Sequence, residues 1–166
     1  MTRIITILLA IVVAGGQIPR GYRGIVPLKS TREDVERLFG KPTDSEPEIY
    51  QFRDEIVTFG YAKYGCKPAP VVPGWPNPPL EGWNVPPDTV LVVRINLRKQ
   101  VPLGSLGFDL TTFKKVRGDT DVGSHFQYVD EEAGLTIDLN GDGGTETVRG
   151  YIYEPEAKYK DLRCSE

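Results

Sequence analysis

Residues 89–97 read TVLVVRINL, and this stretch decides the fold that the sequence predicts. Most of its side chains are branched at Cβ, which favours extended backbone because such side chains lose rotamer freedom in a helix. Its apolar residues also follow one another without the i, i+3, i+4 spacing of an amphipathic helix. We therefore expect a strand at the centre of a β-sheet here.

Five further segments have the composition of strands, and polar or glycine-containing turns separate them. Residues 108–113 are ambiguous between a short helix and an edge strand. Together with the central strand, the pattern predicts an antiparallel sheet of about six strands. The five additional strands are expected at residues 49–52, 56–61, 126–129, 135–139 and 148–153.

One segment carries a clear helix signal. Ser30 and Glu33 have the spacing of a capping box. Apolar residues then recur on one helical face, and a Gly-x-Pro stop follows. A helix of two to three turns is marginal alone and must pack on the sheet, so the predicted fold class is α+β. Residues 17–29, which precede the helix, are expected to be an irregular leader. The apolar face and the stop are Val35, Leu38, Phe39, Gly40 and Pro42.

Residues 1–16 have the order of a secretory signal peptide. Arg3 precedes an apolar run at residues 4–13, and residues 14–16 are small. Cleavage at this point would leave residues 17–166 as the mature protein. The alternative is a retained membrane anchor, for which the apolar run is shorter than the roughly 20 residues that span a bilayer.

The two cysteines, Cys66 and Cys164, are expected to form a disulfide, because exported chains mature in an oxidising compartment. The bridge would close a loop of nearly 100 residues, for which the chain-entropy model gives roughly 4–5 kcal/mol. The alternative is two unrelated thiols. No cysteine lies near the cleavage point, so we expect no lipid anchor.

The mature chain is expected to be a single domain, since about 150 residues can bury one hydrophobic core. The sequence at residues 50–55, YQFRDE, is similar to FQYVDE at residues 126–131. The two halves of the domain are therefore either copies of one unit or similar by chance. The half-repeats would be residues 24–66 and 89–164, joined by the proline-rich loop 67–88.

Residues 67–88 contain eight prolines, which exclude a helix or an interior strand. We expect a long extended loop, and loops of this length are usually functional or mobile. Tyr64, Trp75 and Trp83 lie in or beside it. They are candidate binding residues, because aromatic side chains on a stiff loop can anchor a partner protein or stack on a sugar ring. The competing interpretation is that the tryptophans fold back and cap the sheet.

Asp138, Asn140 and Asp142 are candidate ligands for calcium. With the glycine that follows Asp142, they match positions 1, 3, 5 and 6 of an EF-hand loop. Position 12 is Arg149 instead of glutamate, and the flanking segments are predicted strands. A hairpin loop rich in turn-forming residues is the interpretation that we favour, and a weak calcium site, with Glu146 as a further ligand, is the alternative. No other cofactor is expected.

The sequence offers no obvious catalytic set. His125 is its single histidine, which excludes His-dependent triads and multi-histidine metal sites. Carboxylates such as Asp54, Glu55 and Asp130 could in principle serve glycoside hydrolysis, although charges at strand turns are more often solvated loop residues. The formal net charge is −3 and the basic pairs are isolated, so no nucleic-acid partner is expected.

Three stretches resemble a group of secreted bacterial proteins of unassigned function: residues 24–42 (GIVPLKSTREDVERLFGKP), 83–87 (WNVPP) and 153–164 (YEPEAKYKDLRC). The helix, its Gly-x-Pro stop and the following hairpin also resemble, at greater distance, the outer-membrane-assembly lipoproteins of the SmpA/OmlA type and the β-lactamase-inhibitor proteins. This resemblance implies an α+β sandwich that binds other proteins. The chain differs in lacking the lipoproteins' cysteine and a clear second copy of the helix motif.

These observations predict an exported, non-enzymatic binding or structural module that contacts another protein in the cell envelope. Its expected location is the periplasm or the cell exterior. One alternative is a small carboxylate-dependent hydrolase that acts on the cell wall or on a polysaccharide. A second alternative is a subunit of a membrane-associated assembly that retains residues 1–16, and only then is membrane contact expected.

Overall fold

The computed structural model describes residues 20–45, 48–63, 65–68, 80–120, 123–140 and 146–164. Tyr64 and residues 69–79 are among those outside it. Its main sheet is built from β1 (Asp44–Ser45), β2 (Glu48–Gln51), β3 (Glu55–Tyr61), β6 (Val90–Pro102), β7 (Lys114–Thr120), β8 (Gly123–Asp130), β9 (Leu135–Asn140) and β10 (Thr147–Tyr153). The remaining elements are the helix α1 (Arg32–Phe39), the paired strands β4 (Lys67–Pro68) and β5 (Leu80–Glu81), and the 3₁₀ helices η1 (Leu103–Leu106), η2 (Leu110–Thr112) and η3 (Ala157–Leu162).

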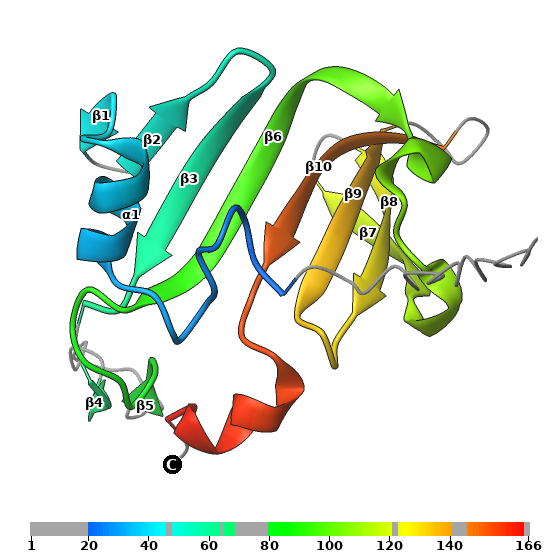
Figure 1. Ribbon diagram of the computed structural model, residues 1–166. Helices are drawn as coiled ribbons and strands as arrows, with labels where there is room; N and C mark the ends of the chain where they lie inside the picture. The colour runs from blue at the N-terminus through cyan, green and yellow to red at the C-terminus, as the bar shows by residue number, and fades with distance from the viewer. Residues whose placement is uncertain are drawn as a thin grey trace, which may run out of the picture.

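The main sheet is antiparallel and has the strand order β1-β2-β3-β6-β10-β9-β8-β7 (Figure 1). Two meanders, β2-β3-β6 and β8-β9-β10, meet in the middle where β6 pairs with β10. The predicted central strand is therefore confirmed, because β6 has a partner on each side. Of the two similar stretches, residues 50–55 span the turn between β2 and β3, whereas residues 126–131 lie in β8 and end at the first residue of the turn to β9. The duplication itself stays a prediction.

The sheet contains seven strands of four or more residues and the two-residue strand β1, where the sequence predicted about six strands. The missed strand is β7, which reads KKVRGDT and pairs with β8 along its full length. The charged residues of β7 gave no strand signal, because strands were predicted from apolar, β-branched runs. Charged side chains are common on strands at the edge of a sheet, where they discourage pairing with another chain. Residues 108–113, the ambiguous segment, contain η2.

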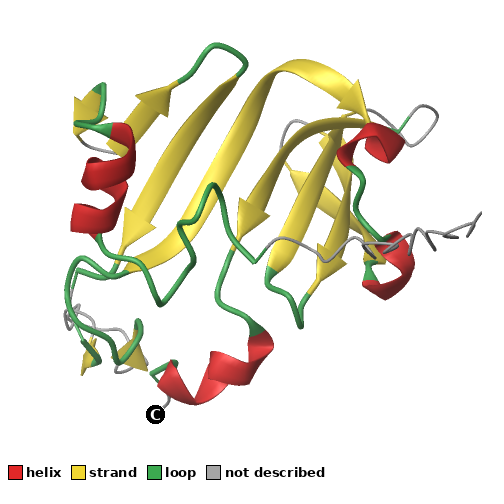
Figure 2. Ribbon diagram, viewed as in Figure 1, coloured by secondary structure: helices red, strands yellow, loops and turns green. Residues whose placement is uncertain are grey.

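The hydrophobic core lies on one face of the sheet, where α1, the N-terminal segment and the helices η1 and η2 cover it (Figures 1 and 2). Val93, Ile95 and Ile137 contribute fully buried side chains from the sheet, and Val35 contributes one from α1. Phe39 packs against the same cluster. The predicted packing of a short helix on the sheet is therefore present.

Leu38, which was expected on the buried face of the helix, is 52% exposed. Val35 and Phe39 lie about 40° apart around the helix axis, and Leu38 lies about 60° away from Val35 on the opposite side. An eight-residue helix that directs Val35 and Phe39 to the sheet therefore leaves Leu38 at the boundary with solvent.

The described part of the N-terminal segment forms no helix, but it packs into the core, which corrects the prediction that residues 17–29 are only a leader. Tyr22 and Ile25 are 4% and 0% exposed and belong to the core. Each donates its backbone N–H to the carbonyl oxygen of the other at 2.9 Å. A Cβ atom at Gly21 would lie 2.1 Å from the carbonyl oxygen of Ile25, so this tight turn requires glycine. The prediction failed because two separated apolar residues produce no local periodicity.

The first turn of α1 is fixed to the sheet by Arg32. Its guanidinium forms ion pairs with Glu48 of β2 and with Asp88, and it lies 4.2 Å from the centre of the Tyr61 ring. An arginine can make such contacts together, because its planar group both pairs with carboxylates and stacks on aromatic rings. These contacts orient a helix that is too short to be stable alone.

The capping box of α1 is formed by Thr31 and Asp34, one residue after the predicted pair Ser30 and Glu33. The Asp34 carboxylate accepts the backbone N–H of Thr31 at 2.9 Å, and the Thr31 hydroxyl oxygen accepts the N–H of Asp34. Ser30 instead accepts the N–H of Val26 within the preceding turn. Both pairs have the correct spacing, so the choice was made by the tertiary position of the helix.

We expect the capping box to give the protein a measurable acid-dependent loss of stability. Hydrogen bonds from Thr31, with a smaller contribution from Arg37, hold the pKa of Asp34 below its usual value. A carboxyl with a lowered folded-state pKa stabilises the fold above its unfolded-state pKa of about 3.9, and this contribution is lost as the pH falls through the folded value. Asp34→Ala should flatten the decline of the urea midpoint below that pH.

Glu33→Ala is the matched control, because Glu33 lies in the same turn but forms no capping hydrogen bond. Its acid profile should follow that of the wild type. An unchanged profile in Asp34→Ala would contradict the role given to the capping box.

Candidate functional site

Of the three aromatic residues predicted to bind a partner, Trp83 is described by the structure. Tyr64 and Trp75 lie outside the described residues. Trp83 is half-buried, and its backbone forms an isolated β-bridge with Arg163 near the C-terminus. This arrangement combines the two interpretations of the sequence, since Trp83 packs against the protein and still keeps part of its surface in solvent.

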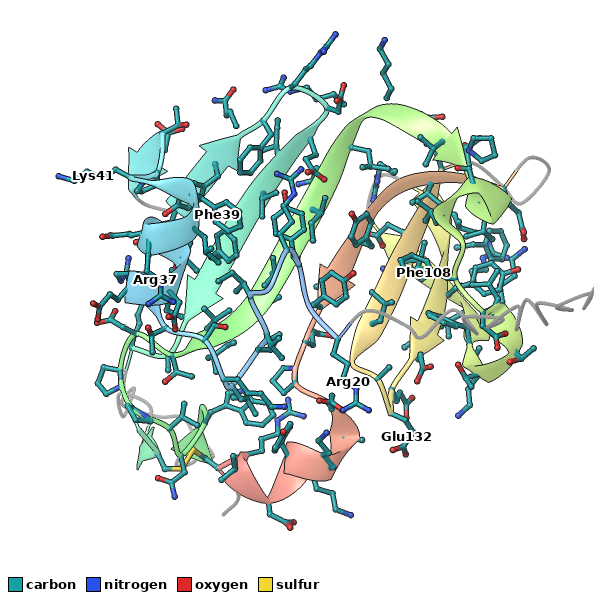
Figure 3. All side chains as sticks on the ribbon, in the orientation of Figure 1. Arg20, Arg37, Phe39, Lys41, Phe108 and Glu132 are labelled. Atoms are coloured by element: carbon teal, nitrogen blue, oxygen red, sulfur yellow. A yellow bond between two sulfur atoms is a disulfide. The ribbon has the colours of Figure 1, made fainter. Side chains whose placement is uncertain are left out.

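A corner of the molecule joins three segments that are far apart in the sequence. Asn84 donates its backbone N–H to Leu162 at 2.7 Å, and Cys164 donates its N–H to Gly82 at 3.0 Å. The disulfide Cys66–Cys164 ties the same C-terminal segment to the chain just before β4 (Figure 3). The two cysteines predicted to pair are therefore bonded. The disulfide and the backbone hydrogen bonds together hold Trp83 beside η3.

A pocket of about 330 Å³ opens beside Trp83, and we call it the Trp83 pocket. Its walls come from the start of β6, from the chain between β10 and η3, and from η3 and the residue after it. Sequence reasoning had identified one of these residues and missed the others, because segments about seventy residues apart meet here. The lining residues are Trp83, Leu91, Val92, Glu154, Pro155, Glu156, Ala157, Lys160 and Arg163.

The charges in the Trp83 pocket are unevenly paired. Glu156 is 8% exposed, and its Oε2 atom accepts a hydrogen bond from Lys158 at 2.7 Å and lies 4.0 Å from Nε of Arg20 (Figure 3). Its Oε1 atom is buried without a hydrogen-bond donor among the described residues. Lys160 and Arg163 are exposed, and their side chains form no ion pair or hydrogen bond with any described residue. The pocket thus contains a buried acceptor and two cations that have no partner among the described residues.

The Trp83 pocket lies at the end of the sheet face opposite the core. Val93 and Tyr153 pair across β6 and β10 and face the core, so their neighbours Val92 and Glu154 face the other way. Apart from η3 at the end beside the Trp83 pocket, no described helix lies over this second face, which we call the open sheet face. Most side chains of the open sheet face are half-buried or exposed, although Thr136 and Asp138 of β9 are buried on it. The half-buried and exposed residues include Ile49, Ile56, Thr58, Val92, Arg94, Val129 and Ile152.

Two of the three carboxylates named for hydrolysis have structural partners, and the third, Asp54, is exposed. Glu55 is 8% exposed and accepts hydrogen bonds from the Tyr22 hydroxyl, at 2.7 Å, and from Arg23. Asp130 is buried and accepts hydrogen bonds from the Thr112 hydroxyl and the Ala133 backbone. Burial and the hydrogen bond to Glu55 raise the pKa of Tyr22, as expected for a hydroxyl that donates to a carboxylate. These acids attach the N-terminal segment and η2 to the sheet.

Two of the three candidate calcium ligands are described. The Asp138 carboxylate accepts a hydrogen bond from the side-chain amide of Gln127 at 2.6 Å, and Asn140 is exposed at the end of β9. Asp142 lies outside the described residues. Glu146, considered as a further ligand, accepts hydrogen bonds from Lys115 and Tyr128, and the first of these does most to lower its pKa. Within the described ranges, no three metal-ligating side chains form a group.

His125 lies in β8, and its side chain is not among those described. The described helices are all too short to cross a membrane.

No model of a known protein family matches the chain, and no curated protein sequence matches it. The chain is similar to the crystal structure of a DUF4309 family protein, YjgB, from Bacillus subtilis, with a TM-score of 0.48 and 14% sequence identity. The match covers 85% of this chain and 88% of the other.

The disulfide should control both stability and the environment of Trp83. Replacing both cysteines, as in Cys66→Ser/Cys164→Ser, removes a cross-link over 98 residues. The chain-entropy model gives an upper figure of about 4–5 kcal/mol for the loss in free energy of unfolding. In a Trp75→Phe background, so that Trp83 is the single tryptophan, we expect a lower urea midpoint and a red-shifted native tryptophan emission.

Trp75→Phe alone, with the disulfide intact, is the control for this measurement. An unchanged emission after removal of the cysteines would show that the backbone hydrogen bonds hold Trp83 without the disulfide.

Proposed function

We propose that this chain is an exported, non-enzymatic binding module of the cell envelope that acts through contact with another protein. The observation that carries the proposal is the open sheet face, which ends in the Trp83 pocket. A sheet with one face packed and the other uncovered has a broad surface for a partner. The partner would be a protein of the periplasm or the cell exterior.

The composition of the open sheet face supports a protein partner. Ile56, Val92 and Ile152 place aliphatic side chains across the middle strands, with Arg94 among them. Protein interfaces have few charges at their centre and are often enriched in arginine and aromatic residues. Trp83 at the end of the face supplies an aromatic side chain of the type that frequently anchors a protein contact.

The disulfide and the signal-like N-terminus support export. A stable disulfide is common in oxidising compartments outside the cytoplasm and rare within it. Glu55 and Asp130 hold the fold together through buried hydrogen bonds, which favours binding over carboxylate catalysis at these positions.

Charge reversal on the open sheet face should abolish binding of the partner protein. Arg94 is exposed on this face, and Arg94→Glu should leave the fold intact while opposing a surface that accepts arginine. The measurement is capture of proteins from the envelope fraction of the native organism, with the retained proteins identified by mass spectrometry. We expect partners that the wild type retains and Arg94→Glu loses.

Lys41→Glu is the matched control, because Lys41 is exposed just after α1, away from the open sheet face (Figure 3). It should retain the same proteins as the wild type. Equal capture by Arg94→Glu and Lys41→Glu would contradict the proposed surface. Turnover in a hydrolase screen that Glu154→Gln abolishes would contradict the non-enzymatic role.

A further inference from the structure

The Trp83 pocket has a mixed lining in which an apolar part, large enough for a small side chain or two, lies beside charged groups. Leu91 and Val92 contribute aliphatic surface from β6, and Pro155 and Ala157 contribute more from the chain that leads into η3. Its volume of about 330 Å³ is at the lower end of the range for ligand sites, roughly 300–1,000 Å³. The pocket therefore fits part of a partner's surface better than a large free ligand.

The charges around this lining favour an anion. The negative charge of Glu156 is offset by the positive charges of Lys158 and Arg20, which both lie near its Oε2 atom. Lys160 and Arg163 have no partner among the described residues, and Glu154 is the remaining acid of the lining. The pocket rim thus has a local excess of positive charge on a chain whose formal net charge is −3. Complementary charge attracts and orients a partner.

The buried Oε1 atom of Glu156 indicates that the ligand should also carry a hydrogen-bond donor. It accepts no hydrogen bond from the described residues, although Glu156 is 8% exposed. A buried acceptor without a donor costs free energy. A ligand that donates an N–H to this oxygen, after a small shift of the side chains that cover it, would recover that free energy. A peptide backbone has such N–H groups next to its side chains.

A peptide fits these features better than an acidic sugar does. A sugar ring can stack on Trp83, but the aliphatic side chains of Leu91, Val92 and Pro155 offer no hydrogen-bond partner to the hydroxyl groups that face them. A peptide segment can place an aliphatic side chain there and a carboxylate toward the cations.

We propose that the Trp83 pocket receives an acidic peptide segment of the partner protein, with an aliphatic side chain on the Trp83 and Leu91 lining and a carboxylate paired with Lys160 and Arg163. This inference rests on the proposed function and specifies the chemistry of the partner at one end of the open sheet face.

The test uses the full mature protein with its disulfide intact and three probes. These are fluorescein-labelled peptides of sequence DLDLD and KLKLK and, as an acidic sugar, labelled trigalacturonate. Binding is followed by fluorescence anisotropy at low and at high salt. We expect DLDLD to bind, to weaken at high salt, and to bind more tightly than KLKLK and trigalacturonate.

The variant Lys160→Glu/Arg163→Glu should weaken DLDLD binding by roughly ten-fold or more, because it replaces two attractive contacts with repulsion. Lys99→Glu is the matched control, since Lys99 is exposed on β6 outside the pocket lining, and it should bind as the wild type does. Trp83→Ala, checked for folding by circular dichroism, should also lose affinity for DLDLD.

Absence of DLDLD binding, equal binding of DLDLD and KLKLK, or unchanged binding by the double variant would overturn the inference. Preferential binding of trigalacturonate would overturn it in favour of an acidic glycan site. If the envelope partner is lost with Arg94→Glu but kept by Lys160→Glu/Arg163→Glu, the pocket inference fails and the proposed function stands. If neither variant loses a partner, both the pocket inference and the proposed function fail.

Discussion

Strand β6 pairs with β3 along one edge and with β10 along the other, and the rest of the structure is arranged around this double pairing. Val93 and Ile95 of β6 are fully buried on the core face. The contact with β10 is close, since a Cβ atom at Gly150 would lie 2.3 Å from the carbonyl oxygen of Ile95. Any side chain at that position would force the two strands apart. Because this pairing joins the two meanders, one hydrophobic core extends across the whole sheet.

The N-terminal segment and α1 complete the core over the first meander. Tyr22 fills space against the rings of Phe39 and Phe52, and its hydroxyl donates to the buried carboxylate of Glu55. Arg23 provides the compensating positive charge and also lies over the Phe52 ring. A buried carboxylate is tolerated only with such partners. The same contacts explain why a glutamate in a turn-like sequence is structural here.

The corner near the C-terminus connects this architecture to a surface for binding. The chain enters β6 and leaves β10 at the same end of the sheet, because the two strands are neighbours and antiparallel. The C-terminal segment then returns to residues 82–84, where backbone hydrogen bonds and the disulfide hold it. Trp83 and the cations of the pocket are therefore positioned by the central strand pair. The surface proposed for binding and the stability of the core depend on the same register.

The sequence by itself determined the features that arise from neighbouring residues. The β-branched run at residues 89–97 predicted the central strand, and the apolar spacing with a Gly-x-Pro stop predicted α1. The presence of two cysteines in a chain with a signal-like N-terminus predicted the pair Cys66–Cys164. Each of these rests on local backbone preference or on a choice among very few partners, and both can be read along the chain.

The tertiary structure decided the features that depend on distant residues. Strand β7 exists because β8 offers it an edge, and its own charged sequence gives no local signal. Tyr22 and Ile25 are core residues because the sheet lies beneath them. The Trp83 pocket brings Leu91 close to Lys160 and Arg163, and its one buried oxygen without a donor exists only when those segments meet. Burial and charge pairing depend on all neighbours in space, so no local pattern could have revealed them.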